Sequence, residues 1–377
     1  MILNDVCELI VDCLHSTAYD EGCGYPLIRT PNIGRGRLIL DDVHRVSEKV
    51  YIERNVRATP QEDDLVLARE APAGNIAIIG KNQKVCLGQR TVLIRPDIKK
   101  VSSLYLMYYL LMPNQQYELL GTANGATVPH VNMSTIRKLP IALPDLDTQK
   151  RVAEFINVYD DLIENNQKQI KLLEEAAQRL YKEWFIDLRF PGHENVEIVD
   201  GVPEGWNIGI LSDIGPFKRG KTITKAKIVE GEVPVISGGL GPAYYHNESN
   251  TSSPVITVSG SGANAGFTRL YYTKVFASDC SFVDIEQTPY LYWIYLFLKN
   301  NSSRLDMLQK GSAQPHVYAK DINALECVIP IREVLNLFCE VVGSYFNKIG
   351  ILEQQIIQLT EARDRLLPKL MSGEIEV

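Results

Sequence analysis

The chain repeats one stretch of its own sequence without insertion or deletion, at a constant separation of 186 residues. The segment Gly125–Val131 (GATVPHV) returns as Gly311–Val317 (GSAQPHV), and the same separation places Pro144 on Pro330. Solenoid repeats are much shorter, at roughly 20–50 residues. The repeat therefore predicts two copies of a whole domain with its following helix, in a chain with a pseudo-two-fold internal repeat.

A long helix is predicted after each copy of the repeated segment. Apolar residues recur at alternating steps of three and four over four heptads, which is typical of a coiled coil. The seam residues that we expect to pack in the helices or against other subunits are Ile156, Tyr159, Ile163, Ile170, Leu173 and Leu180, and then Val342, Tyr345, Ile349, Ile356, Leu359 and Leu366. An antiparallel pair is the simplest arrangement. Two unrelated amphipathic helices, each packed on its own domain, are the alternative.

Two positions interrupt this pattern. Asn166 is a polar residue in the seam, matched with Leu352 in the repeat, and such a residue commonly fixes helix register. Pro368 is expected to end or kink the second helix, because proline lacks the N–H group and its ring clashes with the preceding turn. A break at Pro368 argues against matching Leu370 with Trp184.

Each long helix follows a domain of mixed α/β (α+β-like) character, in which short β-rich runs alternate with Gly and Pro turns. The predicted strands are Leu65–Leu67, Ile76–Ile79 and Thr91–Ile94, and then Val233–Ile236, Val255–Val258 and Lys274–Ala277. Aromatic-rich helices are predicted over Leu104–Tyr117 and Pro289–Lys299. We expect a first domain over residues 1–144, a helix over 145–187, a second domain over 188–330 and a second helix with the tail over 331–377.

The two domains differ in length and in how they begin. Pro26 to Pro129 spans 103 positions, whereas the matching Pro234 to Pro315 spans 81. The second domain opens with a lead-in, residues 202–214, for which the first shows no counterpart. We expect the C-terminal tail and the N-terminus to supply this lead-in together, in a ring-like arrangement with adjacent termini.

Composition limits the functions that are open to the chain. The net charge of −7 gives no overall basic field, so nucleic-acid binding has to rest on local patches. The seven cysteines contain no C-x-x-C pair, which favours reduced thiols over zinc sites or disulfides. No apolar run approaches 18 residues, so we expect a cytoplasmic protein with no membrane partner.

A phosphate-binding string is present in the second domain. Gly215–Thr222 matches G-x-x-x-x-G-K-[ST] letter for letter. A P-loop needs a helix that begins at the Lys-Thr pair, because its N-terminal N–H groups bind the phosphates. The residues that follow, Ile223–Val229, are β-branched and lack a helical stripe. A basic turn is therefore favoured over a nucleotide site.

A second glycine-rich segment, Ser259–Gly266, follows a predicted strand and precedes another. A dinucleotide site would need a helix at this point, so a hairpin with close backbone approach is the better interpretation. The matching place in the first domain is Arg69–Gly74. Corresponding hairpin loops with different side chains suit two modules that share a scaffold and bind different targets, although variable turns would give the same pattern.

The histidines of the repeated Pro-His-Val segment, His130 and His316, are the obvious catalytic or metal candidates. No second His, Cys or carboxylate lies at ligand spacing from either, so a structural hydrogen bond or a phosphate contact is favoured, and no metal site is predicted. No motif for methyl transfer, serine hydrolysis or zinc proteolysis occurs. The sequence predicts no catalytic constellation.

Local basic and polar groups are the candidates for DNA contacts. Phosphate contacts position a protein on DNA, whereas contacts to base edges select the sequence. The candidate DNA-binding residues are Arg35, Arg37, Arg69, His130, Lys218, Arg219, Lys221, Ser259, Ser261, Asn264 and His316.

The motifs at the helix ends are specific. Leu139–Pro144 (LPIALP) leads into the first helix, and the chain closes with Glu361–Ile375 (EARDRLLPKLMSGEI). These motifs follow an α/β domain before each helix. In their order, the chain closely resembles the specificity (S) subunit of type I restriction–modification enzymes over nearly its full length.

The resemblance implies two target-recognition domains that each read one half of a split, asymmetric site in double-stranded DNA, with the helices as a spacer. Two modification subunits would carry S-adenosylmethionine and methylate adenine, and restriction subunits would carry ATP and Mg²⁺. The chain would be a non-catalytic subunit without a cofactor of its own. A stand-alone P-loop enzyme and a coiled-coil scaffold for protein binding are the alternatives.

Overall fold

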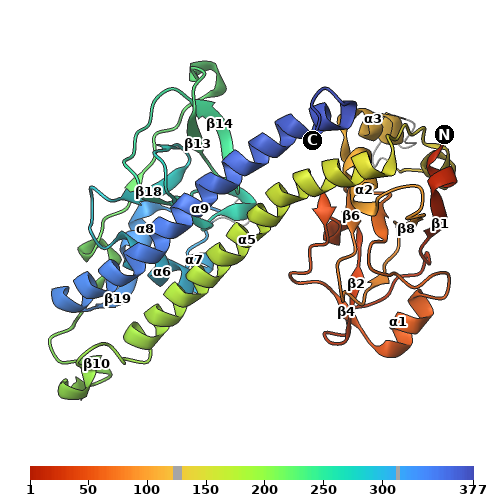
Figure 1. The fold of residues 1–377 in the computed structure, drawn as a ribbon. Coiled ribbons are helices and arrows are strands. Elements are labelled where there is room, and N and C mark those ends of the chain that lie inside the picture. Colours follow the sequence, from red (N-terminus) through yellow and green to blue (C-terminus); the bar gives the residue numbers. More distant parts are fainter. Residues whose placement is uncertain (122–129, 311–314) are drawn as a thin grey trace. The chain divides into compact units, whose positions relative to one another are not determined.

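A computed structural model of the chain describes residues 1–121, 130–310 and 315–377. Most of the repeated segment, residues 125–129 and 311–314, lies outside this range. The chain divides into two compact units, the first formed by Met1–Ile163 with Gln358–Val377 and the second by Glu164–Ile357 (Figure 1). Each unit therefore combines one domain with parts of both long helices.

Over residues 1–121 and 130–144, the first domain contains two sheets and four short helices. The larger sheet has the order β1 (Cys7–Asp12), β8 (Thr91–Pro96), β5 (Leu65–Ala68), β6 (Ile76–Ile78) and β3 (Gly36–Arg37). The smaller has the order β4 (Arg45–Val46), β2 (Tyr25–Ile28) and β7 (Cys86–Leu87). The helices are α1 (Glu48–Arg54), α2 (Ser103–Leu111), α3 (Pro113–Gly121) and α4 (Met133–Lys138), and a 3₁₀ turn, η1 (Leu3–Val6), precedes β1.

The second domain follows the same plan. Its larger sheet has the order β12 (Lys218–Arg219), β18 (Cys280–Asp284), β15 (Val255–Ser259) and β16 (Thr268–Tyr271), and its smaller sheet the order β14 (Pro242–His246), β13 (Val233–Ile236) and β17 (Phe276–Ala277). Two ribbons join β9 (Ile198–Val199) to β10 (Val202–Pro203) and β11 (Asn207–Ile210) to β19 (Glu326–Ile329). The helices are α6 (Leu291–Asn300), α7 (Ser302–Met307) and α8 (Ala319–Asn323), with the 3₁₀ turn η4 (Leu211–Asp213).

Strand pairing shows which elements of the two domains correspond. β5 pairs antiparallel with β6 and β8, as β15 does with β16 and β18. β2 pairs parallel with β7, as β13 does with β17, so Pro26 and Pro234 occupy the same place. The difference in length arises in two links, because residues 29–44 and 47–64 of the first domain correspond to 237–241 and 247–254 of the second.

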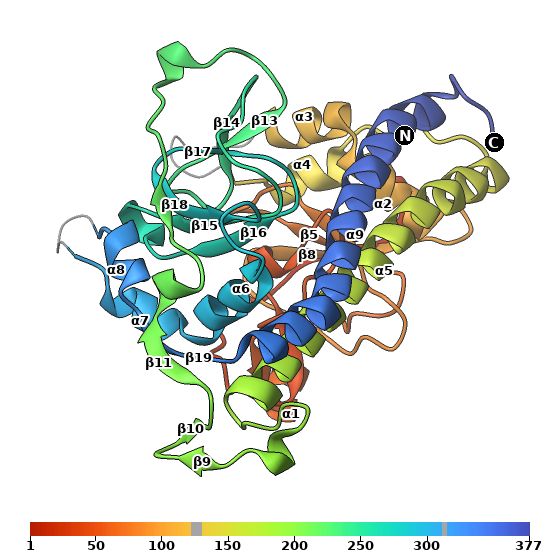
Figure 2. The ribbon, with the colours of Figure 1, turned by 90° about the vertical axis from the view of Figure 1, so that its left-hand side faces the viewer.

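The long helices are α5 (Leu146–Phe185) and α9 (Arg332–Ser372), which run side by side in both ribbon views (Figures 1 and 2). Within the second unit Asn166 Nδ2 donates to Gln355 Oε1 at 3.2 Å, and within the first Arg363 binds Asp160 at 2.6 Å. Tyr181 packs on Phe338 in the second unit, and Arg151 donates to the Val377 carbonyl oxygen in the first. Within each unit, residue numbers therefore rise along α5 as they fall along the segment that faces it, so the pair is antiparallel. No helix in the described ranges is long and apolar enough to cross a bilayer.

The predicted seam faces the interior of each unit. Ile156, Val342 and Ile349 are fully buried, and the other predicted seam residues are half-buried. Asn166 is also buried, and its hydrogen bond to Gln355 compensates for the cost of desolvating its amide. The helices are therefore part of both domain cores.

The second helix contradicts one expectation, because α9 continues through Pro368 to Ser372. Only the last turn of the helix follows the proline. Leu370 in that turn is buried at 4% exposure in the core of the first unit. Packing of this turn offsets the hydrogen bond that proline cannot make. Trp184, which the repeat matches with Leu370, is likewise buried, so each helix has a buried apolar residue in its last turn.

The helix predicted over Leu104–Tyr117 is two helices, α2 and α3. Pro113 begins the second of them. A proline disfavours the helical backbone conformation in the residue before it. Met112 is accordingly extended, at φ −63° and ψ 146°. Proline is well suited to the first position of a helix, where its missing N–H costs nothing.

The expectation that the first domain lacks a lead-in is wrong in part. The Leu3 N–H donates to the Leu139 carbonyl oxygen and the Leu211 N–H to that of Leu325, both at 2.9 Å. The turns η1 and η4 therefore correspond. Because the matching residues are the first few of the chain, the sequence offered too short a pattern to find them.

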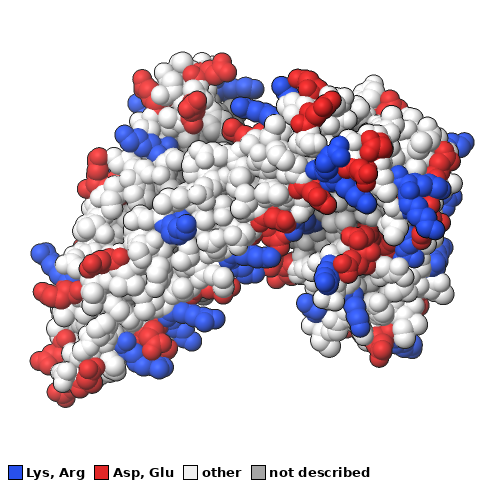
Figure 3. All heavy atoms as spheres, viewed as in Figure 1, with Lys and Arg blue, Asp and Glu red and all other residues white. Residues whose placement is uncertain are grey.

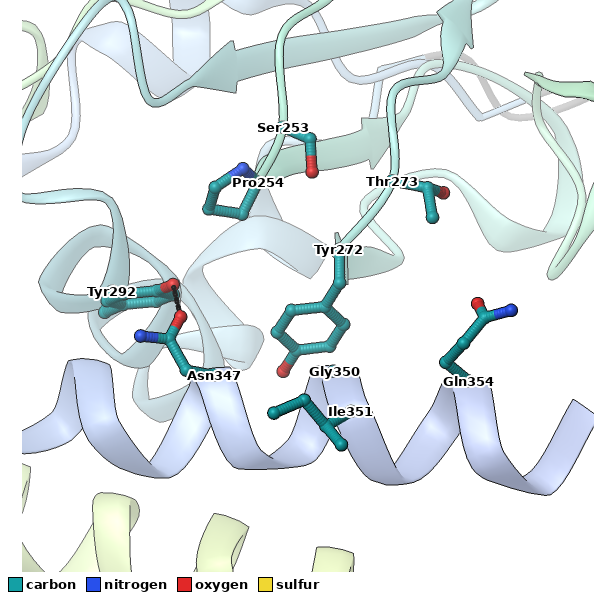
Figure 4. A pocket seen from close by; sticks show the side chains of 9 residues that line it. All are labelled: Ser253, Pro254, Tyr272, Thr273, Tyr292, Asn347, Gly350, Ile351 and Gln354. Carbon is teal, nitrogen blue, oxygen red and sulfur yellow. Dashed lines mark hydrogen bonds between the residues drawn. The ribbon is translucent and has the colours of Figure 1, made fainter.

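The second domain contacts α9 through Tyr272. A Cβ atom on Gly350 would lie only 2.8 Å from Tyr272 Cγ, so glycine permits the close approach of ring and helix. Beside this contact lies a cavity of about 470 Å³, between the helix and residues of the domain that include Pro254 and Tyr292 (Figure 4). The Tyr292 hydroxyl donates to Asn347 Oδ1 of α9 at 3.3 Å.

Two carboxylates, Glu174 of α5 and Glu353 of α9, are half-buried in the second unit. Burial raises the pKa of both, and for Glu353 the Glu174 carboxylate adds to the rise while Arg269 opposes it. Because the folded-state pKa lies above the unfolded value, the fold favours the protonated form. The resulting contribution to stability is present at low pH and is lost as pH rises through the folded-state pKa.

Replacing Glu353 by glutamine is therefore expected to raise the unfolding temperature by about 1–3 °C at pH 7.5. The gain should shrink as the pH falls towards 4, where the wild-type carboxylate is itself protonated. Thermal unfolding between pH 4 and pH 8 measures this, with the exposed Glu340→Gln on the same helix as control. A gain that does not vary with pH would show that charge burial is not its cause.

Candidate nucleic-acid interface

Three loops of the first domain meet at one place, here called the first loop junction: the β5–β6 loop (residues 69–75), the β7–β8 turn (88–90) and the His130–Val131 segment. Backbone hydrogen bonds hold it together. The Arg69 N–H donates to the Arg90 carbonyl oxygen at 2.9 Å, and the Val131 N–H donates to that of Arg69 at 3.1 Å.

The second domain contains the same junction, formed by residues 260–267, 278–279 and 315–317. The Gly260 N–H donates to the Asp279 carbonyl oxygen and the Val317 N–H to that of Gly260, both at 3.1 Å. Arg69 therefore corresponds to Gly260, and Arg90 to Asp279. The prediction that the glycine-rich segment is a hairpin matching residues 69–74 is confirmed.

Side chains of the first junction form a charged network. His130 Nδ1 lies 2.5 Å from Glu70 Oε1, and Arg69 Nη2 lies 2.7 Å from His130 Nε2. Arg69 Nε donates to the Val131 carbonyl oxygen at 2.8 Å, which leaves Arg69 only 7% exposed. Arg90 Nε pairs with the other Glu70 oxygen at 3.0 Å, and its side chain is 56% exposed. Arg69 and His130 therefore support the loop, while Arg90 reaches solvent.

The second junction has different chemistry on the same backbone. Ser261 Oγ donates to Asp279 Oδ2, and Asn264 Nδ2 lies 3.4 Å from the Gly238 carbonyl oxygen. His316 stacks on Tyr318, with ring centroids 5.9 Å apart. Ser259, at 3% exposure, lies beneath the loop. Ser261, Asn264 and His316 thus all lie in the second junction, where Ser261 and His316 form a β-bridge, whereas Ser259 is buried.

The phosphate-binding string does not form a P-loop. Lys218 and Arg219 lie in strand β12, and a 3₁₀ turn at residues 225–227 stands where a P-loop has a helix. The N–H groups of Gly220 and Lys221 donate to the carbonyl oxygens of Cys280 and Ala277, at 2.8 and 2.9 Å. These N–H groups are therefore not free to bind phosphate. The side chains of Lys218, Arg219 and Lys221 are exposed and form a basic strap along the sheet edge.

Two predicted DNA-binding residues lie away from the first junction's network. Arg35 Nη2 donates to the Leu111 carbonyl oxygen at the end of α2, at 3.1 Å. Arg37 pairs with Asp161 of α5. Both arginines contact helices of the first unit. Charges of both signs are interspersed on the face drawn in Figure 3, so the basic groups act as local patches.

Sequence reasoning missed Glu70, Arg90 and Asp279. Arg90 and Asp279 each close a short turn before a buried strand, where no motif or periodicity distinguishes them. Their equivalence is evident only from the hydrogen bonds to Arg69 and Gly260. Over residues 1–121, 130–310 and 315–377, no group of three or more His, Cys, Asp or Glu is placed to hold a metal ion.

Comparison with known proteins agrees with this architecture. The family described as "Type I restriction modification DNA specificity domain" matches residues 1–175 and 203–361. The MjaIX specificity subunit of Methanocaldococcus jannaschii is 28% identical over 364 residues, covering 88% of this chain and 82% of that protein. The HindI specificity subunit of Haemophilus influenzae is 24% identical, covering 75% and 80%.

Among solved structures, the S subunit of a type I restriction–modification system from M. genitalium has the same fold. The two superimpose with a TM-score of 0.63 at 16% sequence identity, over 98% of this chain and 95% of the other.

The fold is that of a protein with two similar α/β domains, each with a loop junction and each combined with long antiparallel helices. The family match covers both halves, so the chain belongs to the type I restriction–modification DNA specificity family. The chain is a DNA sequence-recognition subunit. It is a non-catalytic component of a type I restriction–modification enzyme and assembles with other subunits of that enzyme.

Proposed function

We propose that the chain reads a bipartite, asymmetric site in double-stranded DNA, one half with each domain, and directs methylation and cleavage by its partner subunits. The observation that carries this proposal is the pair of loop junctions. Their backbone hydrogen bonds are the same, while the side chains they present differ. A constant frame with two different sets of side chains is what recognition of two different half-sites requires.

The basic and polar groups divide between two tasks. Lys218, Arg219 and Lys221 are exposed at a sheet edge and suit phosphate contacts, which position a protein without selecting sequence. Residues of the junctions, such as Ser261 and Asn264, suit contacts to base edges in the major groove. Buried Arg69 and Ser259 support the loops from below.

The partners in this proposal are two modification subunits, which carry S-adenosylmethionine, and restriction subunits, which carry ATP and Mg²⁺. The chain itself holds no cofactor. The helices offer apolar surface for these partners, because Phe155, Val158 and Leu162 follow one another at helical spacing on α5 and are 40–56% exposed. Solvent-exposed apolar stripes on a helix favour packing against another helix.

Mapping methylated adenines tests the proposal. The chain is co-expressed with its modification subunits, and methylation is read across a whole genome. We expect one motif with two defined halves and a spacer of constant length, and no methylation by the modification subunits alone. A motif without a spacer, or the same motif in the absence of the chain, would contradict the proposal. Robust ATP hydrolysis by the isolated chain, abolished by Lys221→Ala, would instead support the P-loop alternative.

A further inference from the structure

We propose that Arg90 and Asp279, which occupy equivalent positions in the two loop junctions, each select one base in the half-site of their own domain. Arg90 reads a guanine, and Asp279 reads the amino group of a cytosine. The inference rests on the proposed function, and it names the residues and the base chemistry that distinguish the two halves.

Corresponding backbone hydrogen bonds hold the turns that contain these two residues. Besides the bond to the hairpin loop, each turn is tied to the smaller sheet. The Gly88 N–H donates to the Ile28 carbonyl oxygen and the Ser278 N–H to that of Ile236, both at 2.8 Å. Each turn is therefore fixed at two points. Arg90 and Asp279 occupy the same position relative to the hairpin loop, although Arg90 alone has a positive φ, of +68°.

Arg90 is positioned as a guanine reader. Its Nε is held by Glu70 at 3.0 Å, and the other Glu70 oxygen is held by His130 at 2.5 Å. Within the described part of the chain, its terminal nitrogens make no hydrogen bond. A guanidinium held through Nε presents Nη1 and Nη2, the pair of donors that matches the O6 and N7 acceptors of guanine. The ion pair with Glu70 already restricts the Arg90 side chain before DNA binds. Contact with guanine therefore costs less side-chain entropy.

Asp279 presents the opposite chemistry. Its Oδ2 accepts the Ser261 hydroxyl, which orients the carboxylate and leaves Oδ1 as a free acceptor within the described residues. A carboxylate accepts a hydrogen bond from the amino group of cytosine in the major groove and repels the acceptor face of guanine. The backbone of Lys221, in the basic strap, is bound at Ala277, two residues before Asp279. The nearby strap offsets the repulsion between the carboxylate and the DNA phosphates.

A purely structural ion pair is the competing explanation for Arg90. It predicts an effect of Arg90 substitutions on stability or on total methylation, but none on the motif. Base selection predicts a changed motif in one half-site only. The two explanations therefore differ in a quantity that methylation mapping measures directly.

The test uses the full chain co-expressed with its modification subunits. Arg90→Asn is the first variant, because Arg90 has φ +68° and asparagine tolerates this region better than most residues. Arg90→Lys is the second, since it keeps the charge but loses the bidentate fork. Asp279→Asn tests the other domain. The matched control is Arg57→Ala, which removes an exposed ion pair with Asp12 in the first domain.

We expect both Arg90 variants to lose the preference for guanine at one position of one half-site, with methylation of sites bearing another base there raised about 10- to 100-fold relative to the wild-type motif. The other half-site and the spacer should not change, and Asp279→Asn should relax one position of the opposite half. Arg57→Ala should leave the whole motif unchanged.

An unchanged motif in the Arg90 and Asp279 variants, or a uniform loss of methylation at all sites, would overturn the inference. Relaxation in both half-sites would overturn it as well. The proposed function itself fails differently, because the wild-type chain would then give no bipartite motif at all. Should Arg90→Asn fail to fold, as judged by its thermal unfolding, the lysine variant gives the same decision.

Discussion

Phe338→Ala is expected to lower the free energy of unfolding by about 3–5 kcal/mol, the usual cost of removing a buried aromatic ring. Phe338 lies on α9, is fully buried, and packs against Tyr181, Trp184 and Phe185 of α5. The nearest of these rings, that of Phe185, has its centroid 4.7 Å away in an edge-to-face arrangement. The substitution would therefore leave a cavity between the two helices in the second unit.

Equilibrium unfolding in urea, followed by tryptophan fluorescence, measures this loss, because Trp184 and Trp206 lie in the same cluster of aromatic side chains. Leu337→Ala is the matched control. Leu337 is the preceding residue on the same helix and is 42% exposed, so its loss should cost less than about 1 kcal/mol. Similar costs for the two variants would show that α9 does not pack on α5 through this aromatic cluster.

Insertion of one heptad into each long helix is expected to lengthen the spacer of the recognised site while leaving both half-sites unchanged. The boundaries of the two compact units give the places, after Ile163 in α5 and after Ile357 in α9. Seven residues preserve the 3.5-residue period of the seam. They add about 10 Å at 1.5 Å per residue, which corresponds to about three base pairs at 3.4 Å each.

Methylation mapping with the modification subunits again provides the measurement. A heptad inserted into α5 alone is the control, because the pairs Asn166–Gln355 and Asp160–Arg363 cannot then both be kept, and specific methylation should be abolished. If the double insertion left the spacer unchanged, the helices would not set the distance between the half-sites. If it changed the bases of a half-site, the domains would not be independent readers.

The seam of the helices was predictable because it depends on a local period. Residues such as Ile156 and Ile349 recur at steps that place them on one side of a helix, and burial of that side follows from hydrophobicity alone. Asn166 was found by the same means, as the polar residue that interrupts the pattern. The strands around Val255 and Thr91 were predictable for a similar reason, since β-branched residues between turns favour strands.

The errors came where packing overrides a local preference. Pro368 disfavours a helix wherever it stands, yet the burial of Leu370 holds the last turn of α9 in place. The start of the first domain is a second case, because the bond from Leu3 to Leu139 joins segments more than 130 residues apart. A local pattern contains no information on such a pairing.

By itself the sequence determined the duplication, the antiparallel helix pair as its simplest explanation, and the resemblance to the specificity family. All three depend on spacing along the chain, which a sequence records directly. Only the tertiary structure decided which residues of the two domains are equivalent at the loop junctions. Arg90 and Asp279 differ in residue type, and they are not separated by the 186 residues that relate the repeated segments. The domains that contain them also differ in length. Their equivalence rests on backbone hydrogen bonds between strand ends. Such bonds form whatever side chain the residue carries, so residue type does not indicate them.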